Sequence, residues 1–243
     1  MAKTIHTVVF QAQEGGGNPC PVTLEAGEMT AEQMQTMTRG FGQESAFLMK
    51  PSRFDCQIRV RYFVPLHEME MCIHATIASV MVLVREGICR ESPIVFETVL
   101  GSVPISWAYN GDRIDVSVEQ FPAKYLNQNP TREEVCKVLR IQGEAMGQAP
   151  IQSAATSRFK LIVPLADKDI LDTLKPDFEA LWELCDRYGT TGFYPFAMER
   201  RKDETVFQGE AMGRPSVIYA DVLLEDGHII RTRVRGNAEI LKK

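Results

Sequence analysis

A thiol and an imidazole stand two residues apart in the stretch MEMCIHATIAS, which covers residues 69–79. Cys72 and His74 lie where a polar, strand-like segment changes into an apolar run. A cysteine beside a histidine can form a nucleophilic pair, and both side chains are also common metal ligands. The stretch therefore indicates either a reactive site or an ordinary junction between a strand and a helix.

The apolar run that follows this pair predicts a buried helix. CIHATIASVMVLVREG is apolar on nearly all sides and stops at Gly87, and such a helix belongs inside a domain. The first turn of the helix presents unpaired backbone N–H groups and the positive end of the helix dipole beside Cys72 and His74. This position favours a thiolate at Cys72. A buried structural cysteine is the competing interpretation, and we prefer it.

A metal site is a further interpretation of the same stretch. Glu68, Glu70, Cys72 and His74 alternate, so that in a strand they would share one face. The predicted helix begins near Cys72 and breaks that face, and no second pair with metal-ligand spacing occurs elsewhere. We therefore predict no metal site.

The composition is that of a globular protein with an ordinary core. The 243 residues suit one large domain or two lobes, and the net charge of −5 gives no basic field for nucleic acid or an acidic membrane. The N-terminus MAKTIHTVVF lacks the pattern of a signal peptide, and no apolar stretch reaches the ~18 residues of a membrane span. The six cysteines are scattered without a C-x-x-C pair, which favours free thiols and a cytoplasmic location.

The order of the predicted elements indicates an α+β fold with largely antiparallel sheets. Helices are expected after Thr30 and Thr131, where Gln33 and Glu134 complete capping boxes, and at 175–189. Strands are expected at 5–10, 45–49, 56–63, around 94–103, and at 113–118, 159–165, 192–199, 216–224 and 228–236. GGGNPCP reads as a turn, and Asp226-Gly227 predicts a hairpin.

The pattern of strands, an amphipathic helix and more strands roughly repeats, with a boundary near residues 120–130. We therefore expect an N-terminal lobe at 1–122 and a C-terminal lobe at 123–243. A cleft between two lobes is a common place for a small-molecule site.

Four motifs in a fixed order resemble the PhzF-like proteins of phenazine biosynthesis, which belong to the diaminopimelate epimerase superfamily. They are GGNP, GQESAFL, IRVRYFVPLHEMEMCIHATIAS and QGEAMGRPS. The resemblance implies two similar lobes, each a curved sheet around a central helix, with the active site between them. It also implies a cofactor-independent isomerase that moves a proton on a small carboxylate-bearing substrate.

The resemblance also implies the roles of individual residues. The family's acid/base glutamate corresponds to Glu44, which by itself would read as a surface or capping carboxylate. The histidine of the family's C-G-H-A-T motif corresponds to His74. The substrate-binding positions implied are Asn18, Ile73, His74 and Ala75, the last three partly through backbone amides at the helix start.

The chain departs from the family pattern at two places. Ile73 stands where the family has a glycine, and its branched side chain crowds the approach to the backbone. The segment ETVF runs directly into QGEAMGRPS, so that the family's E-D-P-x-T-G loop and second central helix are absent. Half of a two-sided site is then missing, which predicts weak or lost activity. A sheet without its central helix would also expose apolar surface, which predicts a homodimer that covers the sheet.

Two other functions stay open on the sequence alone. The chain could be a non-catalytic relative that binds a small ligand or dimerises. It could also be a cysteine-based amino-acid racemase or epimerase, in which two thiols on opposite lobes act as base and acid. That reaction would need Cys72 and a second cysteine on the absent loop, because Cys136 and Cys185 lie in amphipathic helices at core-like spacing. We expect no cofactor and no metal for any of these functions.

Overall fold

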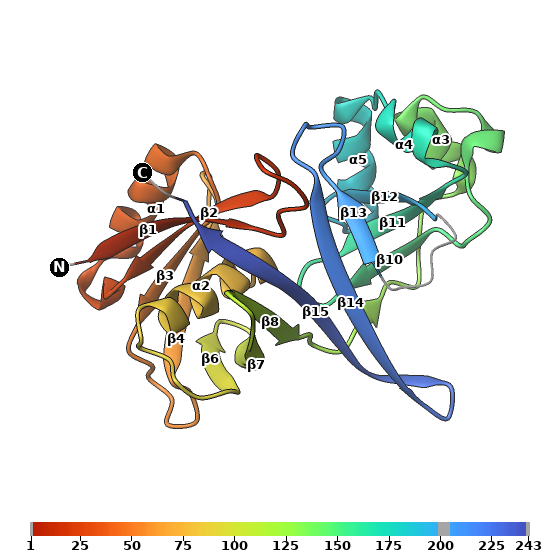
Figure 1. Cartoon of the computed structure of the whole chain (residues 1–243). Coiled ribbons are helices and arrows are strands. Elements are labelled where there is room, and N and C mark those ends of the chain that lie inside the picture. The colour runs from red at the N-terminus through yellow and green to blue at the C-terminus, as the bar shows by residue number, and fades with distance from the viewer. Residues whose placement is uncertain (1, 199–204, 242–243) are drawn as a thin grey trace. The chain divides into compact units, whose positions relative to one another are not determined.

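The apolar helix α2 (Ile73–Arg85) lies among β-strands in the computed structural model, which describes residues 2–198 and 205–241 (Figure 1). Its residues from Ala75 to Val84 are all buried, and it packs against β1, β2, β3, β8 and β15. Burying one large apolar side chain contributes about 1.5–3 kcal/mol, so this helix supplies much of the core. The sequence-based expectation of a buried helix at this position is confirmed.

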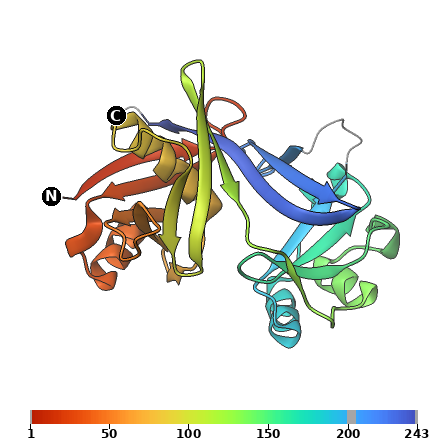
Figure 2. The ribbon, with the colours of Figure 1, turned by 90° about the horizontal axis from the view of Figure 1, so that it is seen from below.

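The strands around α2 form a closed ring. The order is β1-β2-β3-β4-β6-β7-β8-β15, and β15 pairs with β1 as well as with β8. Figure 2 shows the long β7–β8 hairpin of this ring in yellow-green. The strands are β1 (Lys3–Val9), β2 (Asn18–Leu24), β3 (Ser45–Met49), β4 (Ile58–Phe63), β6 (Ile94–Thr98), β7 (Gly101–Asn110), β8 (Arg113–Glu119) and β15 (His228–Ile240).

The ring closes where Phe10 meets β15. The backbone N–H of Phe10 donates to the Asn237 carbonyl at 3.0 Å. A Cβ at Gly236 would lie 2.2 Å from the Phe10 ring, so that only glycine allows the ring to pack against this strand. The α+β fold that the sequence predicts is confirmed, and the curved sheet that the family resemblance implies around a central helix closes here into a barrel.

Strand β2 corrects the prediction of a turn at GGGNPCP, because the strand already begins at Asn18. Pro19 and Pro21 cannot donate to a ladder, which argued against a strand. Both prolines lie before Val22 and Thr23, the two positions at which β2 pairs with β3. The region around 94–103 likewise contains two strands rather than one, with a turn at Val99-Leu100.

Helix α1 (Ala31–Phe41) precedes β3 and carries the predicted capping box. The Thr30 hydroxyl accepts from the Gln33 N–H, while the Gln33 side chain accepts from the Thr30 N–H. The helix stops at Gly42, whose φ of 64° a side chain would disfavour. A 3₁₀ turn (Ala26–Glu28) and the short strand β5 (Glu68–Met69), which pairs with β4, complete this region.

A hairpin extends the sheet beyond the ring. Strand β14 (Ser216–Glu225) pairs with β15 and with β13 (Thr205–Gln208), and the turn at Asp226-Gly227 is the predicted one. Within residues 205–216 the chain passes from β13 to β14 through a turn at 210–213 and contains no helix. The described residues at this point of the sequence therefore form two strands joined by a turn.

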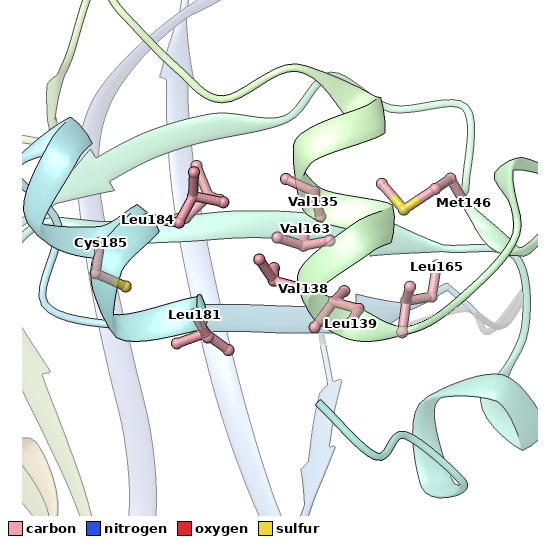
Figure 3. Close-up of a cluster of buried hydrophobic side chains, with 10 residues drawn as sticks. Val135, Val138, Leu139, Met146, Val163, Leu165, Leu181, Leu184 and Cys185 are labelled. Carbon is pink, nitrogen blue, oxygen red and sulfur yellow. The ribbon is translucent and has the colours of Figure 1, made fainter. Parts of the chain in front are cut away.

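The remaining residues form a separate sheet with helices on one face. Its strand order is β12-β11-β10-β9, from β12 (Phe193–Ala197), β11 (Lys160–Leu165), β10 (Gln152–Ala155) and β9 (Lys124–Tyr125). Helices α3 (Arg132–Leu139), α4 (Lys168–Asp172) and α5 (Phe178–Tyr188) pack there, with a 3₁₀ turn at Gly143–Ala145. Figure 3 shows side chains of α3, α5 and β11 gathered in this core, among them Val138, Val163 and Leu184.

Contacts divide the chain into two compact units. Unit 1 comprises residues 2–120 and 205–241, and unit 2 comprises 121–198. The contacts thus place the C-terminal hairpin with the first unit, whereas the sequence analysis assigned 123–243 to one lobe. The last residue of the strand predicted at 192–199 lies outside the described residues, as do residues 200–204. None of the described helices is long and apolar enough to cross a membrane.

Candidate functional site

Glu44 lies between a helix and a strand in unit 1. Helix α1 ends at Phe41 with Gly42 as its C-cap, and β3 begins at Ser45. The Ser45 hydroxyl donates to the Gln43 carbonyl at 3.1 Å. Ser45 is fully buried, which fixes the backbone next to Glu44. The Glu44 side chain itself keeps 41% of its surface exposed. A carboxylate held by its backbone and open to solvent can meet a ligand.

His74 lies on the first turn of α2 and contacts Glu44 directly. His74 Nε2 is 3.1 Å from Glu44 Oε2, and the His74 side chain is only 14% exposed. Burial lowers the pKa of His74, although the Glu44 carboxylate raises it. The ring is therefore neutral at pH 7, and the tautomer with a proton on Nε2 donates to Glu44. The structure thus brings together the two residues that were predicted to be catalytic.

Cys72 joins this pair as a third member. Its Sγ lies 3.4 Å from His74 Nδ1 and 3.8 Å from Glu44 Oε2, and the residue is 6% exposed. In the tautomer described above, Nδ1 accepts from the thiol, so that the three side chains form a chain of hydrogen bonds. We refer to Glu44, Cys72 and His74 as the site triad.

The thiol of Cys72 is not activated in this environment. Burial raises the pKa of Cys72 well above its usual range, and the nearby Glu44 and Cys20 raise it further. Cys20 on β2 is fully buried, and burial together with Glu44 also raises its pKa. The positive end of the helix dipole does not outweigh these effects. The interpretation of Cys72 as a buried thiol agrees with this environment, but the sequence analysis missed its contacts with both partners.

Hydrogen bonds of two buried side chains, Tyr62 and Thr76, hold the first turn of α2 in place. The Tyr62 hydroxyl on β4 lies 2.6 Å from Thr76 Oγ1, and Thr76 Oγ1 donates to the Cys72 carbonyl at 2.8 Å. Both residues are buried. Only the hydrophobic alternation of β4 was visible in the sequence, and nothing in it identified Tyr62 as a support for the site.

Three further residues were predicted to bind substrate. Ile73 and Ala75 flank His74 on the first turn, where the backbone N–H groups of the helix have no carbonyl one turn earlier. Ile73 is half-buried at the position where the family pattern has glycine. Asn18 begins β2, which runs parallel to β3, so that it lies at the same end of the sheet as Glu44 but outside the site triad.

The alternating metal set considered in the sequence does not assemble in the structure. The Glu68 carboxylate is engaged by Arg61, whose Nε and Nη2 both donate to it at 2.7 Å. Strand β5 ends at Met69, and α2 begins at Ile73, so that no strand face connects these positions. Within the described residues, the ligand atoms that do gather are those of the site triad, which lie within 4.8 Å of one another.

Comparison of the sequence and of the structure with known proteins points to the same family. The sequence profile of the PhzC-PhzF family, described as phenazine biosynthesis-like protein, matches residues 8–204. The chain is 27% identical over 248 residues to the uncharacterized isomerase YddE of Escherichia coli K12, with 94% of this chain and 83% of the relative covered. The structure also matches that of a predicted epimerase from Pseudomonas aeruginosa, with a TM-score of 0.85, 17% identity and coverage of 100% and 98% of the two chains.

Two other relatives add information on length and on a named activity. An uncharacterized isomerase of Clostridium acetobutylicum is 22% identical over 286 residues, which cover 96% of this chain and 94% of the relative. Because this chain has 243 residues, that relative contains internal residues without a counterpart here. The trans-2,3-dihydro-3-hydroxyanthranilate isomerase of Pseudomonas aeruginosa is 25% identical over 178 residues, with 73% and 62% of the two chains covered.

Proposed function

Because the chain belongs to the PhzC-PhzF family of phenazine biosynthesis-like proteins, we propose that it is a cofactor-independent isomerase in which Glu44 transfers a proton. The observation that supports this most is the contact of 3.1 Å between the half-exposed Glu44 carboxylate and His74 at the N-terminus of α2. A general base must be reachable by the substrate and held in one orientation. Glu44 meets both conditions.

The start of α2 suits a negatively charged group of the substrate. The N–H groups of Ile73, His74 and Ala75 and the helix dipole favour an anion there. We propose that these groups hold a substrate carboxylate, with Asn18 as a further binding residue. The neutral His74 ring would orient Glu44 and donate to the substrate when the carboxylate takes up the proton. The substrate class is then a small, cyclic or amino-acid-like carboxylate.

The name of the Pseudomonas aeruginosa relative supplies a first substrate to test. Trans-2,3-dihydro-3-hydroxyanthranilate carries a carboxylate and an amino group on a ring, which agrees with the proposed class. Under this proposal, Glu44 takes a proton from one carbon and returns it to another on the same face of the ring. No step requires a redox change, so that atoms and electrons balance within the substrate.

We further propose that turnover is slow. The family resemblance places a second loop and helix opposite the first lobe, and the chain runs from β13 to β14 without them in the described residues. A substrate would then be held from one side, with more water around the reacting atoms, which weakens positioning and electrostatic stabilisation. Ile73 adds crowding at the anion-binding turn.

Incubation of the protein with a panel of small carboxylates in deuterated water tests this function. Slow incorporation of solvent deuterium that is lost in Glu44→Gln supports the proposal. Incorporation at an efficient rate would contradict the expectation of slow turnover. The absence of any incorporation that depends on Glu44, with every substrate tried, would contradict the isomerase function itself.

A second candidate function is a non-catalytic relative that binds a partner, in particular a second copy of the chain. The observation that favours it is an apolar face on the three strands β13, β14 and β15, which we call the β13–β15 hairpin. This face carries Leu224 (57% exposed) and Ile229 (60% exposed). A tight homodimer without exchange activity would support this candidate. A monomer that exchanges deuterium would contradict it.

A further inference from the structure

The site triad combines the three kinds of side chain that bind zinc. Glu44 offers a carboxylate oxygen, Cys72 a sulfur and His74 a ring nitrogen, and these atoms all lie within 4.8 Å of one another. They come from two separate parts of unit 1, the link before β3 and the first turn of α2. Carboxylate, thiolate and imidazole are all ligands that zinc takes in proteins.

The separations between the three ligand atoms fit one tetrahedral ion. Zinc bond lengths of ~2.0–2.3 Å and tetrahedral angles place two ligand atoms about 3.3–3.6 Å apart. The separations here are 3.1 Å for His74 Nε2 to Glu44 Oε2, 3.8 Å for Glu44 Oε2 to Cys72 Sγ and 3.9 Å for His74 Nε2 to Cys72 Sγ. Each lies within about 0.3 Å of this range. Rotation of the exposed Glu44 side chain can adjust the two separations that involve Glu44, and a small movement of the His74 ring would shorten its separation from Cys72 Sγ.

The charges of such a complex would balance. Zinc carries two positive charges, the Glu44 carboxylate and a Cys72 thiolate carry one negative charge each, and His74 is neutral. A neutral complex costs less to desolvate in a half-buried site than an isolated ion does. A neutral complex also avoids the net repulsion that the positive end of α2 would exert on a bare cation.

We infer that the site triad binds one zinc ion through Glu44, Cys72 and His74, with the fourth coordination position open toward the exposed side of Glu44. On binding, the S–H bond of Cys72 breaks, its proton passes to solvent, and a bond between sulfur and zinc forms without any change of oxidation state. The His74 proton moves from Nε2 to Nδ1, so that the Nε2 lone pair binds the metal and Nδ1–H faces the sulfur. Sites with three protein ligands and an open position leave zinc accessible to a water molecule or a ligand.

Zinc binding and isomerisation would exclude each other, because the same carboxylate and ring would serve as metal ligands. The inhibition by zinc rests on the proposed isomerase function, whereas zinc binding to the site triad does not. Zinc would therefore act as an inhibitor of the isomerase. A carboxylate substrate could still occupy the open position without reacting.

Titration of the metal-free protein with Co²⁺ tests the binding directly, since cobalt replaces zinc in such sites and is coloured. We expect one equivalent to produce the visible bands of four-coordinate cobalt and a near-ultraviolet band from a bond between sulfur and cobalt. Added Zn²⁺ should abolish both. In Cys72→Ser the sulfur band should be lost, and in His74→Gln and Glu44→Gln the affinity should fall more than about tenfold.

Cys56→Ser is the matched control, because the Cys56 thiol also lies beside a carboxylate, 3.9 Å from Asp55 Oδ1. This variant should retain both bands. The inference is wrong if the unmodified protein gives no sulfur band, if the band survives in Cys72→Ser, or if Cys56→Ser removes it. Deuterium exchange with and without Zn²⁺ is a separate experiment that tests the inhibition. If the protein has no isomerase activity, the cobalt titration still tests whether the site triad binds metal.

Discussion

At the scale of single residues, the proposed chemistry depends on three side chains with different environments. Glu44 is exposed and can meet a substrate, His74 is shielded and neutral, and Cys72 is buried with a raised pKa. A cysteine two residues before a histidine suggested a catalytic couple. The structure favours Glu44 and His74 as the working pair, because a thiol with a raised pKa is a poor nucleophile at pH 7.

The reactivity of the thiols tests this assignment. With iodoacetamide at pH 7, we expect Cys136 to react before Cys72, because Cys136 is half-buried whereas Cys72 is buried with a strongly raised pKa. Peptide mass spectrometry of timed samples identifies the order. The cysteine-based racemase would require a reactive thiolate at Cys72, so that modification of Cys72 first would revive that alternative.

At the scale of elements, helix α2 connects the core of unit 1 to the site. Its middle is buried on all sides within the barrel, while its first turn carries Cys72 and His74. The hydrogen bond between Tyr62 and Thr76 joins that first turn to β4. Loss of packing along the helix should therefore disturb both stability and the geometry of the site.

A cavity in the middle of α2 should destabilise unit 1. Ile77 is fully buried, so that Ile77→Ala should lower the free energy of unfolding by about 2–5 kcal/mol. Trp107 lies on β7 and Trp182 on α5, so that each unit holds one tryptophan. Denaturant unfolding followed by Trp107 fluorescence in a Trp182→Phe background measures unit 1.

Ile88→Ala is the control for this experiment, because Ile88 lies three residues after the end of the helix at Arg85 and is 56% exposed. Its effect should stay within about 0.5 kcal/mol. Equal effects of the two substitutions would contradict the central position of α2.

The capping box of α3 should make unit 2 sensitive to acid. Hydrogen bonds from the Thr131 backbone and from Tyr188 lower the pKa of Glu134, and Arg187 adds to this. A lowered folded pKa gives stability that is present above the unfolded value of ~4.3 and is lost as the pH falls through the folded pKa. Glu134→Gln should therefore be less stable than the unmodified protein at pH 7, and the difference should shrink below about pH 4.

Unfolding followed by Trp182 fluorescence in a Trp107→Phe background checks this at a series of pH values. Glu133→Gln is the matched control, because Glu133 is an exposed acid in the same first turn and near the same helix dipole. A difference that grows toward low pH would have the wrong sign for a depressed carboxyl pKa.

The elements that carry strong local signals were predictable from the sequence. The capping boxes at Thr30 and Thr131, the all-round apolar helix and the Asp226-Gly227 turn all form as expected. Strand β2 was missed because prolines argue against a strand unless its pairing partners are known. The closure of the barrel depends on pairing between β1 and β15, which lie more than 200 residues apart and leave no local signal.

The site was predictable only in part, because it depends on contacts between residues that are distant in the sequence. The approach of Glu44 to His74 follows from the order of strands around α2, which the family resemblance implied and local patterns did not. The support from Tyr62 and the contacts of Cys72 depend on side-chain packing, on which the sequence carries no pattern.

At the scale of the whole molecule, the most prominent feature is the apolar face of the β13–β15 hairpin. Residues on one face of β14 face apolar partners on the paired strands, such as Ile218 opposite Val206 and Leu224 opposite Ile229. The other face of β14 carries a charged pair, in which Arg235 donates two hydrogen bonds to Asp221. An exposed apolar face is expected on a sheet whose covering helix is absent.

Self-association should depend on this face. We expect sedimentation velocity to show a dimer whose fraction rises with concentration, because association would cover apolar surface. Leu224→Lys should shift the equilibrium to the monomer. Leu223→Lys is the control, since Leu223 is 51% exposed on the opposite face of the same strand. A monomer at every concentration, or equal effects of both substitutions, would contradict the homodimer.

The central claim is that Glu44 transfers a proton at the start of α2. Its most direct test is deuterium incorporation into trans-2,3-dihydro-3-hydroxyanthranilate by the metal-free protein in deuterated water, followed by mass spectrometry. We predict slow incorporation that falls by about 10²–10⁴-fold in Glu44→Gln and is unchanged in Glu91→Gln, which replaces an exposed carboxylate elsewhere in unit 1. Incorporation by Glu44→Gln at the rate of the unmodified protein would contradict the claim.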